Sequence, residues 1–99
     1  MFTGIVQGIR KISLVSDIEG VRKLRIQLDD LSENLEPGSS VAVNGVCLTA
    51  VKFSQGWAEF NIIQETLNRS NLSALKSGDS VDIERACSYG DEVGGHHVS

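Results

Sequence analysis

Short segments of alternating apolar and polar residues, separated by glycine turns, constrain the fold of this chain more than any other feature. From Lys23 to Leu28 every polar residue is followed by an apolar one, which indicates a strand with one buried face. Trp57–Ile63 and Ser80–Arg85 alternate in the same way. The chain is therefore expected to consist mainly of short strands.

A hairpin is predicted in the middle of the chain. After the turn signal Pro37-Gly38, the apolar run 40–43 leads into Asn44-Gly45, the dipeptide best suited to a tight turn with positive φ at both positions. Residues 46–53 would form the return strand. Gln55-Gly56 marks the next turn.

Simple alternation along this hairpin predicts which residues share a face. It groups Val41, Val43, Cys47, Thr49, Val51 and Phe53. Cys47 and Thr49 would then lie side by side among apolar residues, as on the floor of a pocket. The residues alone favour a plainer interpretation, in which Cys47 is buried filler and the Thr49 hydroxyl bonds to the backbone.

The remaining segments complete the expected fold. The first strand is predicted over residues 2–15, with Gly4 and Gly8 as sites for a bend or bulge. Residues 65–75 look helical, capped by Ser70 or Asn71. The carboxylate of Glu65 in a first helical turn needs no function, because it complements the helix dipole.

Six short strands with one or two small helices predict an all-β fold. A closed antiparallel barrel of the Greek-key type suits these short strands better than a sandwich, because closure removes exposed edges. The 99 residues are enough for one compact domain. The segment from about residue 88 lacks hydrophobic periodicity and is expected to be a connection to a further part of the protein.

Composition argues against several partners. The formal charge is −4 and the basic residues are scattered, whereas a nucleic-acid footprint clusters cations. The best cluster, Arg22-Lys23-x-Arg25, is expected to be a solvated strand face. Apolar runs are too short to cross a membrane, and the first residues, Met1–Val6, lack the features of a secretory signal, so a cytoplasmic location is expected.

No metal site is expected from the cysteines and histidines. Cys47 and Cys87 lie too far apart for a CxxC pair, and Cys87 is interpreted as buried filler. His96 and His97 are adjacent, which does not give the i, i+4 spacing of a helical zinc pair.

Six segments of the chain together resemble one family, the trimeric two-barrel riboflavin synthases and their relative the lumazine protein. These segments, in order, are Met1–Val6, Gly38–Ala42, Val43–Thr49, Glu65–Leu67, Gly78–Ala86 and Gly90–Ser99. They span the whole chain in the family's order.

The resemblance implies a transferase reaction. Two molecules of 6,7-dimethyl-8-ribityllumazine give one riboflavin and one 5-amino-6-ribitylaminopyrimidinedione by transfer of a four-carbon unit. One lumazine loses a proton from its 7-methyl group while the other accepts a nucleophile at carbon 7. No metal or redox cofactor is implied, and lumazine or riboflavin binds as substrate or product.

The resemblance also implies site residues in this chain. Ser40 and Cys47 match positions that assist proton transfer or activate a nucleophile. The expected substrate-binding residues come from three segments: Gly4, Ile5 and Val6; Cys47, Leu48 and Thr49; and Ile62, Ile63, Gln64, Glu65 and Thr66. Thr49, Glu65 and Thr66 would bind polar atoms of the ring or the ribityl chain.

The chain departs from the family pattern at its end. The family completes its active site with the histidine of a Ser-Gly-His sequence and with a second barrel from another protomer, and this chain stops at Ser99. The 99 residues are therefore expected to bind ligand with little or no turnover. The two-barrel enzyme would be a homotrimer, and the single barrel a homodimer that covers the surface left by the second barrel.

Two other functions remain as alternatives. One is a non-catalytic antenna protein that binds lumazine or flavin. The presence of Ser40, Cys47 and the Glu65-Thr66-Leu67 run favours the enzyme over this antenna protein. The other is a scaffold barrel that oligomerises and binds no small ligand.

Overall fold

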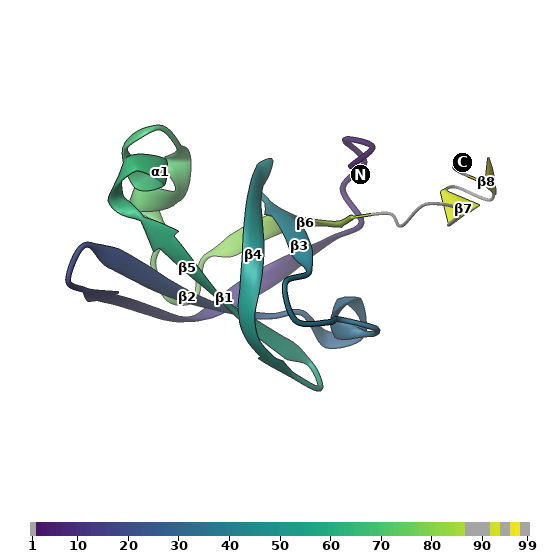
Figure 1. Cartoon of the computed structure of the whole chain (residues 1–99), viewed down its shortest axis with the longest axis horizontal. Coiled ribbons are helices and arrows are strands. Elements are labelled where there is room, and N and C mark those ends of the chain that lie inside the picture. The colour runs from purple at the N-terminus through teal and green to yellow at the C-terminus, as the bar shows by residue number, and fades with distance from the viewer. Residues whose placement is uncertain (1, 87–91, 94–95, 98–99) are drawn as a thin grey trace.

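Six antiparallel strands close into a barrel in the order β1-β2-β5-β4-β3-β6 (Figure 1). The computed structural model describes residues 2–86, 92–93 and 96–97. The barrel strands are β1 (Gly8–Ile18), β2 (Val21–Gln27), β3 (Ser40–Val43), β4 (Val46–Ser54), β5 (Trp57–Ile63) and β6 (Ser80–Arg85). Because β2 lies beside β5, strands β2 to β5 form a Greek key. The expected closed six-stranded barrel is confirmed.

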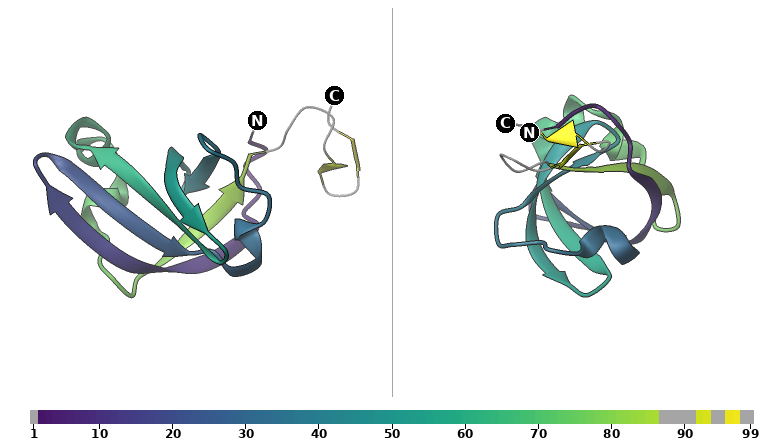
Figure 2. Two further views of the ribbon diagram at one scale, coloured as in Figure 1. Left: turned by 60° about the horizontal axis from the view of Figure 1, so that its bottom comes forward. Right: turned by 90° about the vertical axis from the view of Figure 1, so that its right-hand side faces the viewer.

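Three short helical segments lie in the connections. They are η1 (Asp29–Ser32), α1 (Gln64–Asn68) and η2 (Asn71–Ala74). The helix expected over residues 65–75 is therefore two short pieces, and the Ser70 side chain caps the second by accepting from Leu72 N at 3.3 Å. The sequence analysis missed η1. In Figure 1 and in the left view of Figure 2, η1 and α1 lie at opposite ends of the barrel.

The C-terminal part of the chain adds a separate two-stranded ladder, β7 (Glu92–Val93) with β8 (His96–His97). The interpretation of Cys87 as buried filler falls outside the described residues. The proposed role of the segment after residue 88 as a connection likewise falls largely outside them.

The first strand differs from its prediction in both bounds and bulge. It begins at Gly8 instead of Phe2 and continues to Ile18. Its register with β2 shifts between Ile12 and Leu14, so the bulge lies at neither of the glycines expected to hold it. Gly4 instead has a φ of 82° in the segment before β1, a conformation that glycine adopts without strain.

The β3–β4 hairpin has the predicted turn but not the predicted faces. Asn44 and Gly45 have φ values of 48° and 81°, and Val43 pairs with Val46 across them. A two-residue turn of this kind puts odd-numbered residues of β3 on the same face as even-numbered residues of β4. Val41 and Val43 therefore share the core with buried Leu48.

Cys47 and Thr49 consequently lie on the outer face, and both are exposed. The grouping of Val41 and Val43 with these two residues was wrong, and so was the interpretation of Cys47 as buried filler. A register shift between Ala50 and Lys52 then changes the alternation once more. Phe53 regains the core while Val51 stays exposed.

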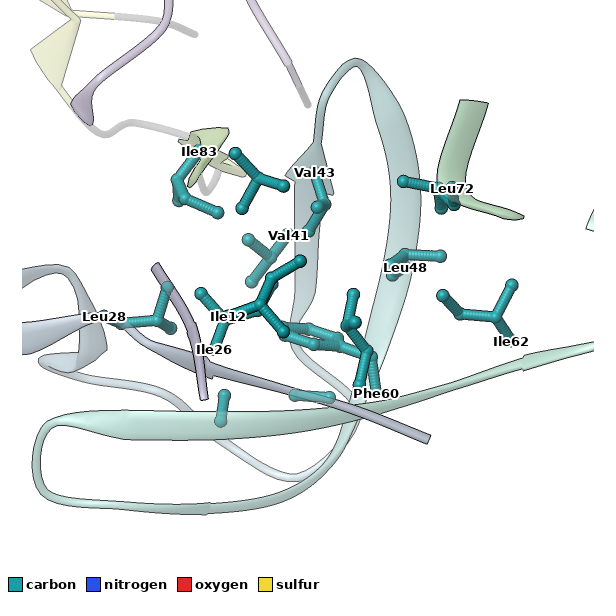
Figure 3. Close-up of a cluster of buried hydrophobic side chains, with 14 of the residues drawn as sticks. Ile12, Ile26, Leu28, Val41, Val43, Leu48, Phe60, Ile62, Leu72 and Ile83 are labelled. Atoms are coloured by element: carbon teal, nitrogen blue, oxygen red, sulfur yellow. The ribbon is translucent and has the colours of Figure 1, made fainter. Parts of the chain in front are cut away.

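Apolar side chains from all six strands fill the barrel interior (Figure 3). The largest fully buried ones are Phe60, Ile12, Leu24, Ile26, Leu28, Ile62, Leu72, Ile83, Val41, Val43 and Val81. Leu67 of α1 and Leu72 of η2 belong to the same cluster, so burial of these two leucines holds the helical connection against the barrel end. A small barrel with its interior filled by side chains offers a small molecule only its outer surface and its ends.

An ion pair joins β2 to β5 on the outer face. Glu59 is only 3% exposed and accepts hydrogen bonds from Arg25, one of them from Nε at 2.9 Å. The guanidinium of Arg25 also lies 4.6 Å from the centre of the Trp57 ring. The hydrogen bonds from Arg25 lower the pKa of Glu59 below its usual 4.5.

This pair predicts a specific loss of stability in acid. A carboxyl whose pKa is lowered by folding stabilises the protein above its unfolded-state pKa, and this contribution is lost as the pH falls through the lower, folded-state value. The free energy of unfolding in urea should therefore drop below pH about 4.5, and Glu59→Gln should make that drop shallower. Glu36→Gln, at an exposed carboxyl in the loop before β3, serves as the control and should leave the profile unchanged. An identical profile for Glu59→Gln would contradict the prediction.

Candidate functional site

Strands β4 and β5 separate at one end of the barrel. The two strands pair from Ser54↔Trp57 to Ala50↔Phe60, and the pairing ends there. Beyond it, β4 stays paired with β3 through Val46–Thr49, and β5 stays paired with β2 through residues 61–63. Figure 1 shows the start of β4 and the end of β5 diverging. We call the space between these two strand ends the β4–β5 opening.

The opening leaves backbone groups without a ladder partner within the described residues. Each strand uses one edge for its remaining neighbour, so the facing edges at 46–49 and 61–63 present free N–H and C=O groups. Backbone polar groups seek hydrogen bonds from water or a ligand when no strand supplies them. The opening can therefore bind the polar edge of a small molecule.

Two of the three expected substrate-binding segments border this opening. Cys47, Leu48 and Thr49 lie on the β4 side, and residues 62–66 lie at the end of β5 and the start of α1. Leu48 and Ile62 are buried and belong to the core. The outward-facing or exposed members are Cys47, Thr49, Ile63, Gln64 and Glu65, and Thr66 is half-buried.

Polar side chains gather on the outer face of the β3–β4 hairpin. Ser40 pairs directly with Thr49, and Ala42 pairs with Cys47. Side chains of such opposed pairs lie about 4.5–5.5 Å apart on one face, so Ser40 is next to Thr49 and diagonal to Cys47. Cys47 is a free, exposed thiol. The two residues expected to act in catalysis therefore share the surface beside the opening.

The third expected segment, Gly4–Val6, approaches from the opposite side of this hairpin. The backbone N–H of Gly4 donates to the carboxylate of Glu84 at 3.1 Å. Glu84 pairs with Ala42 on β3, and Ile5 and Val6 are 59% and 51% exposed. In Figure 1 and in the left view of Figure 2, the β3–β4 hairpin lies between the N-terminal segment and α1. All three segments thus border one surface.

The helical connection that carries Glu65 and Thr66 is anchored by Arg22. This side chain forms a double hydrogen bond with Asp17 at 2.7 and 2.9 Å and donates to the carbonyl oxygens of Leu72 and Ser73 at 3.1 and 2.8 Å. The hydrogen bonds from Arg22 lower the pKa of Asp17, and the same pairing raises the pKa of Arg22. The Arg22 side chain is 15% exposed, so the prediction that it lies on a solvated strand face was wrong.

A hollow of about 210 Å³ lies beside this anchor. The tip of the β1–β2 hairpin and α1 line it, with Gln64 as the one residue that it shares with the expected site. Sequence reasoning missed both Arg22 and Glu84 as residues that hold the site together. For Arg22, the only signal in the sequence was a basic residue within an alternating strand. Glu84 lies in the segment Gly78–Ala86, which resembles the family, but the resemblance gave this residue no role.

Residues 2–86, 92–93 and 96–97 contain no group of three or more His, Cys, Asp and Glu side chains placed to hold a metal ion. In that part of the structure, no helix has the length and apolar character needed to cross a membrane.

Comparisons with known proteins agree on one family. The model of the lumazine binding domain matches residues 3–86. The riboflavin synthase of Escherichia coli (strain K12) is 43% identical over 100 residues, an alignment that covers 100% of this chain and 47% of that protein. The chain therefore spans about half the length of the curated relatives that it matches.

Solved structures of LumP are similar over nearly the whole chain. LumP complexed with 6,7-dimethyl-8-(1'-D-ribityl) lumazine has a TM-score of 0.79 and 33% identity, covering 95% of this chain and 52% of that one. LumP complexed with riboflavin also has a TM-score of 0.79, with 30% identity, covering 95% of this chain and 54% of that one.

Proposed function

The chain belongs to the lumazine-binding domain family, and we propose that it binds 6,7-dimethyl-8-ribityllumazine and riboflavin at the β4–β5 opening. One observation supports this location of the binding site. The unpaired strand edges at 46–49 and 61–63 face each other, with the expected substrate-binding residues on both sides. A pteridine or flavin ring is flat and carries hydrogen-bond donors and acceptors along one edge. Free backbone groups can pair with that edge as a strand would.

The side chains around the opening suit the two parts of such a ligand. Ile63, at the end of β5, is 56% exposed and supplies apolar surface beside the opening, against which a ring can pack. Thr49, Glu65 and Thr66 supply hydroxyl and carboxylate groups that can bond the ribityl hydroxyls. On the other side of the hairpin, the exposed segment Gly4–Val6 completes the proposed binding surface.

Ligand binding predicts a clear effect of two substitutions. Glu65→Ala and Thr66→Ala should each weaken riboflavin and lumazine binding, by roughly tenfold for a lost bond worth about 1.4 kcal/mol. Neither should unfold the chain, because Glu65 is exposed and Thr66 is half-buried outside the core cluster. Fluorescence titration with each ligand measures the Kd.

The matched control is Glu36→Ala, which removes an exposed carboxylate in the loop before β3. It should bind like the original chain. Unchanged affinity in both site variants would show that the binding surface lies elsewhere. A chain that binds neither ligand would refute the proposed function and favour a scaffold barrel.

We further propose that the domain belongs to a riboflavin synthase, with Ser40 and Cys47 assisting proton transfer or nucleophile activation. Both side chains lie on the surface beside the opening. Holding two flat lumazines face to face would supply much of the rate through effective concentration. Turnover should need more than these 99 residues, because the Escherichia coli enzyme is about twice as long. No metal or redox cofactor is required in this proposal, and the protein is placed in the cytoplasm.

A chimera tests the catalytic proposal. This chain alone should form little or no riboflavin from lumazine, whereas its fusion to the second half of the Escherichia coli riboflavin synthase should form it. Ser40→Ala in the chimera should lower kcat by roughly 10²-fold if the hydroxyl takes part in proton transfer, and Ser54→Ala, at an exposed serine of β4, should not. A chimera that binds lumazine without converting it would favour the second candidate function, a non-catalytic lumazine or flavin carrier like LumP.

The same barrel is proposed to form homodimers, and the two-barrel protein homotrimers. Ile5, Val6 and Ile9 are 59%, 51% and 64% exposed, and large apolar side chains left exposed in this way favour self-association. Sedimentation equilibrium should give twice the 10.7 kDa chain mass. Ile9→Ser should shift the equilibrium toward monomer more than Ile18→Ser, at an isoleucine of similar exposure. A monomer at high concentration would contradict the proposal.

A further inference from the structure

Glu84 is a buried carboxylate on the outer face of the barrel. It is the next-to-last residue of β6, directly after the core residue Ile83. It is only 7% exposed. Its direct strand partner is Ala42, which in turn pairs with exposed Cys47. A side chain in this row would normally be hydrated, so something must cover Glu84 and supply its hydrogen bonds.

The N-terminal segment supplies those bonds. Thr3 donates to Oε2 twice, from its backbone N–H at 2.5 Å and from its hydroxyl at 3.0 Å. The N–H of Gly4 donates to both carboxylate oxygens at 3.1 Å. Two successive backbone N–H groups that converge on one anion form a nest, and the positive φ of Gly4 (82°) allows this shape.

These contacts determine where the segment before β1 lies. Its next contact with the barrel is at Gln7, whose N–H donates to the carbonyl of Ile83 at 2.8 Å and whose Oε1 accepts from the N–H of Arg85 at 2.6 Å. Ile5 N–H donates within the segment, to the Thr3 hydroxyl at 3.3 Å. Residues 4–6 are therefore held between two anchors on β6, and the Glu84 carboxylate is the outer one.

We propose that Glu84 is a positioning residue for ligand binding: it holds the backbone of Thr3 and Gly4 so that Gly4–Val6 faces the outer surface of the β3–β4 hairpin. The inference rests on the proposed function, because it concerns the same binding surface. Strands in a sheet are about 4.8 Å apart, so the row from Glu84 through Ala42 to Cys47 places the anchor about 10 Å from the thiol. Glu84 itself acts through the segment and does not touch the ligand.

The test combines a binding measurement with a local one on the 99-residue chain. Glu84→Gln retains the size of the side chain but replaces one of its two acceptor oxygens with an NH₂ group. The donors of Thr3 and Gly4, which bond to two oxygens in the original chain, are then left with one. The Kd for riboflavin should rise roughly tenfold. Amide hydrogen exchange of Thr3 and Gly4, measured by NMR without ligand, should accelerate by at least the same factor, while the amide of Leu24 in the core keeps its protection. Asp82→Asn makes the same charge change at an exposed position of β6 and should alter neither measurement.

A second variant separates positioning from general stability. Thr3→Val removes the hydroxyl donor and leaves Glu84 in place, and it should weaken riboflavin binding about threefold. In the Glu84→Gln background the same change should have almost no effect, because the two residues act through one contact. Additive effects would mean that Glu84 affects binding only through overall stability, and would overturn the inference.

The outcomes distinguish this inference from the proposed function. If the original chain binds riboflavin and Glu84→Gln binds it equally well despite faster exchange at Thr3 and Gly4, the positioning role is refuted while the proposed function stands. If the original chain binds neither riboflavin nor lumazine, the proposed function is refuted and the inference with it.

Discussion

The apolar filling of the barrel determines where everything else in this protein can lie. Side chains from all six strands occupy the interior, so polar and reactive groups are displaced to the outer face and to the barrel ends. The separation of β4 from β5 beyond Ala50 and Phe60 then leaves free backbone groups beside buried Leu48 and Ile62. At the same strand end, Ile63 is 56% exposed, and apolar surface next to unpaired polar edges can bind a flat ring with a polar edge.

Three charged residues attach the outer parts of the structure to this core. Glu84 holds the N-terminal segment, Arg22 holds the helical connection after β5, and Glu59 ties β5 to β2 through Arg25. Each is largely buried, and each has several hydrogen bonds, which offset the cost of removing a charge from water. Glu84 and Arg22 thus hold connecting segments in one arrangement, whereas Glu59 joins two strands of the barrel.

Much of the fold could be predicted from local pattern. Alternation located β2 and β5, the Asn44-Gly45 turn located the β3–β4 hairpin, and Ser70 was one of two predicted caps. The faces of the hairpin were predicted wrongly because alternation was continued through the turn as if the two strands were one. Pairing of Val43 with Val46 reverses the parity, and the register shift after Ala50 reverses it once more. The first of these reversals could have been deduced from the two-residue turn.

The family, the all-β class and the segments expected to form the candidate site follow from the amino-acid sequence, because short-range patterns and motif order depend only on neighbouring residues. The exposure of Cys47 and Thr49, the anchoring roles of Arg22 and Glu84, and the separation of β4 from β5 became visible only in the folded chain. These features depend on strand register and on contacts such as that between Thr3 and Glu84, which are 81 positions apart. No local pattern encodes such contacts, because they arise when barrel closure brings distant strands together.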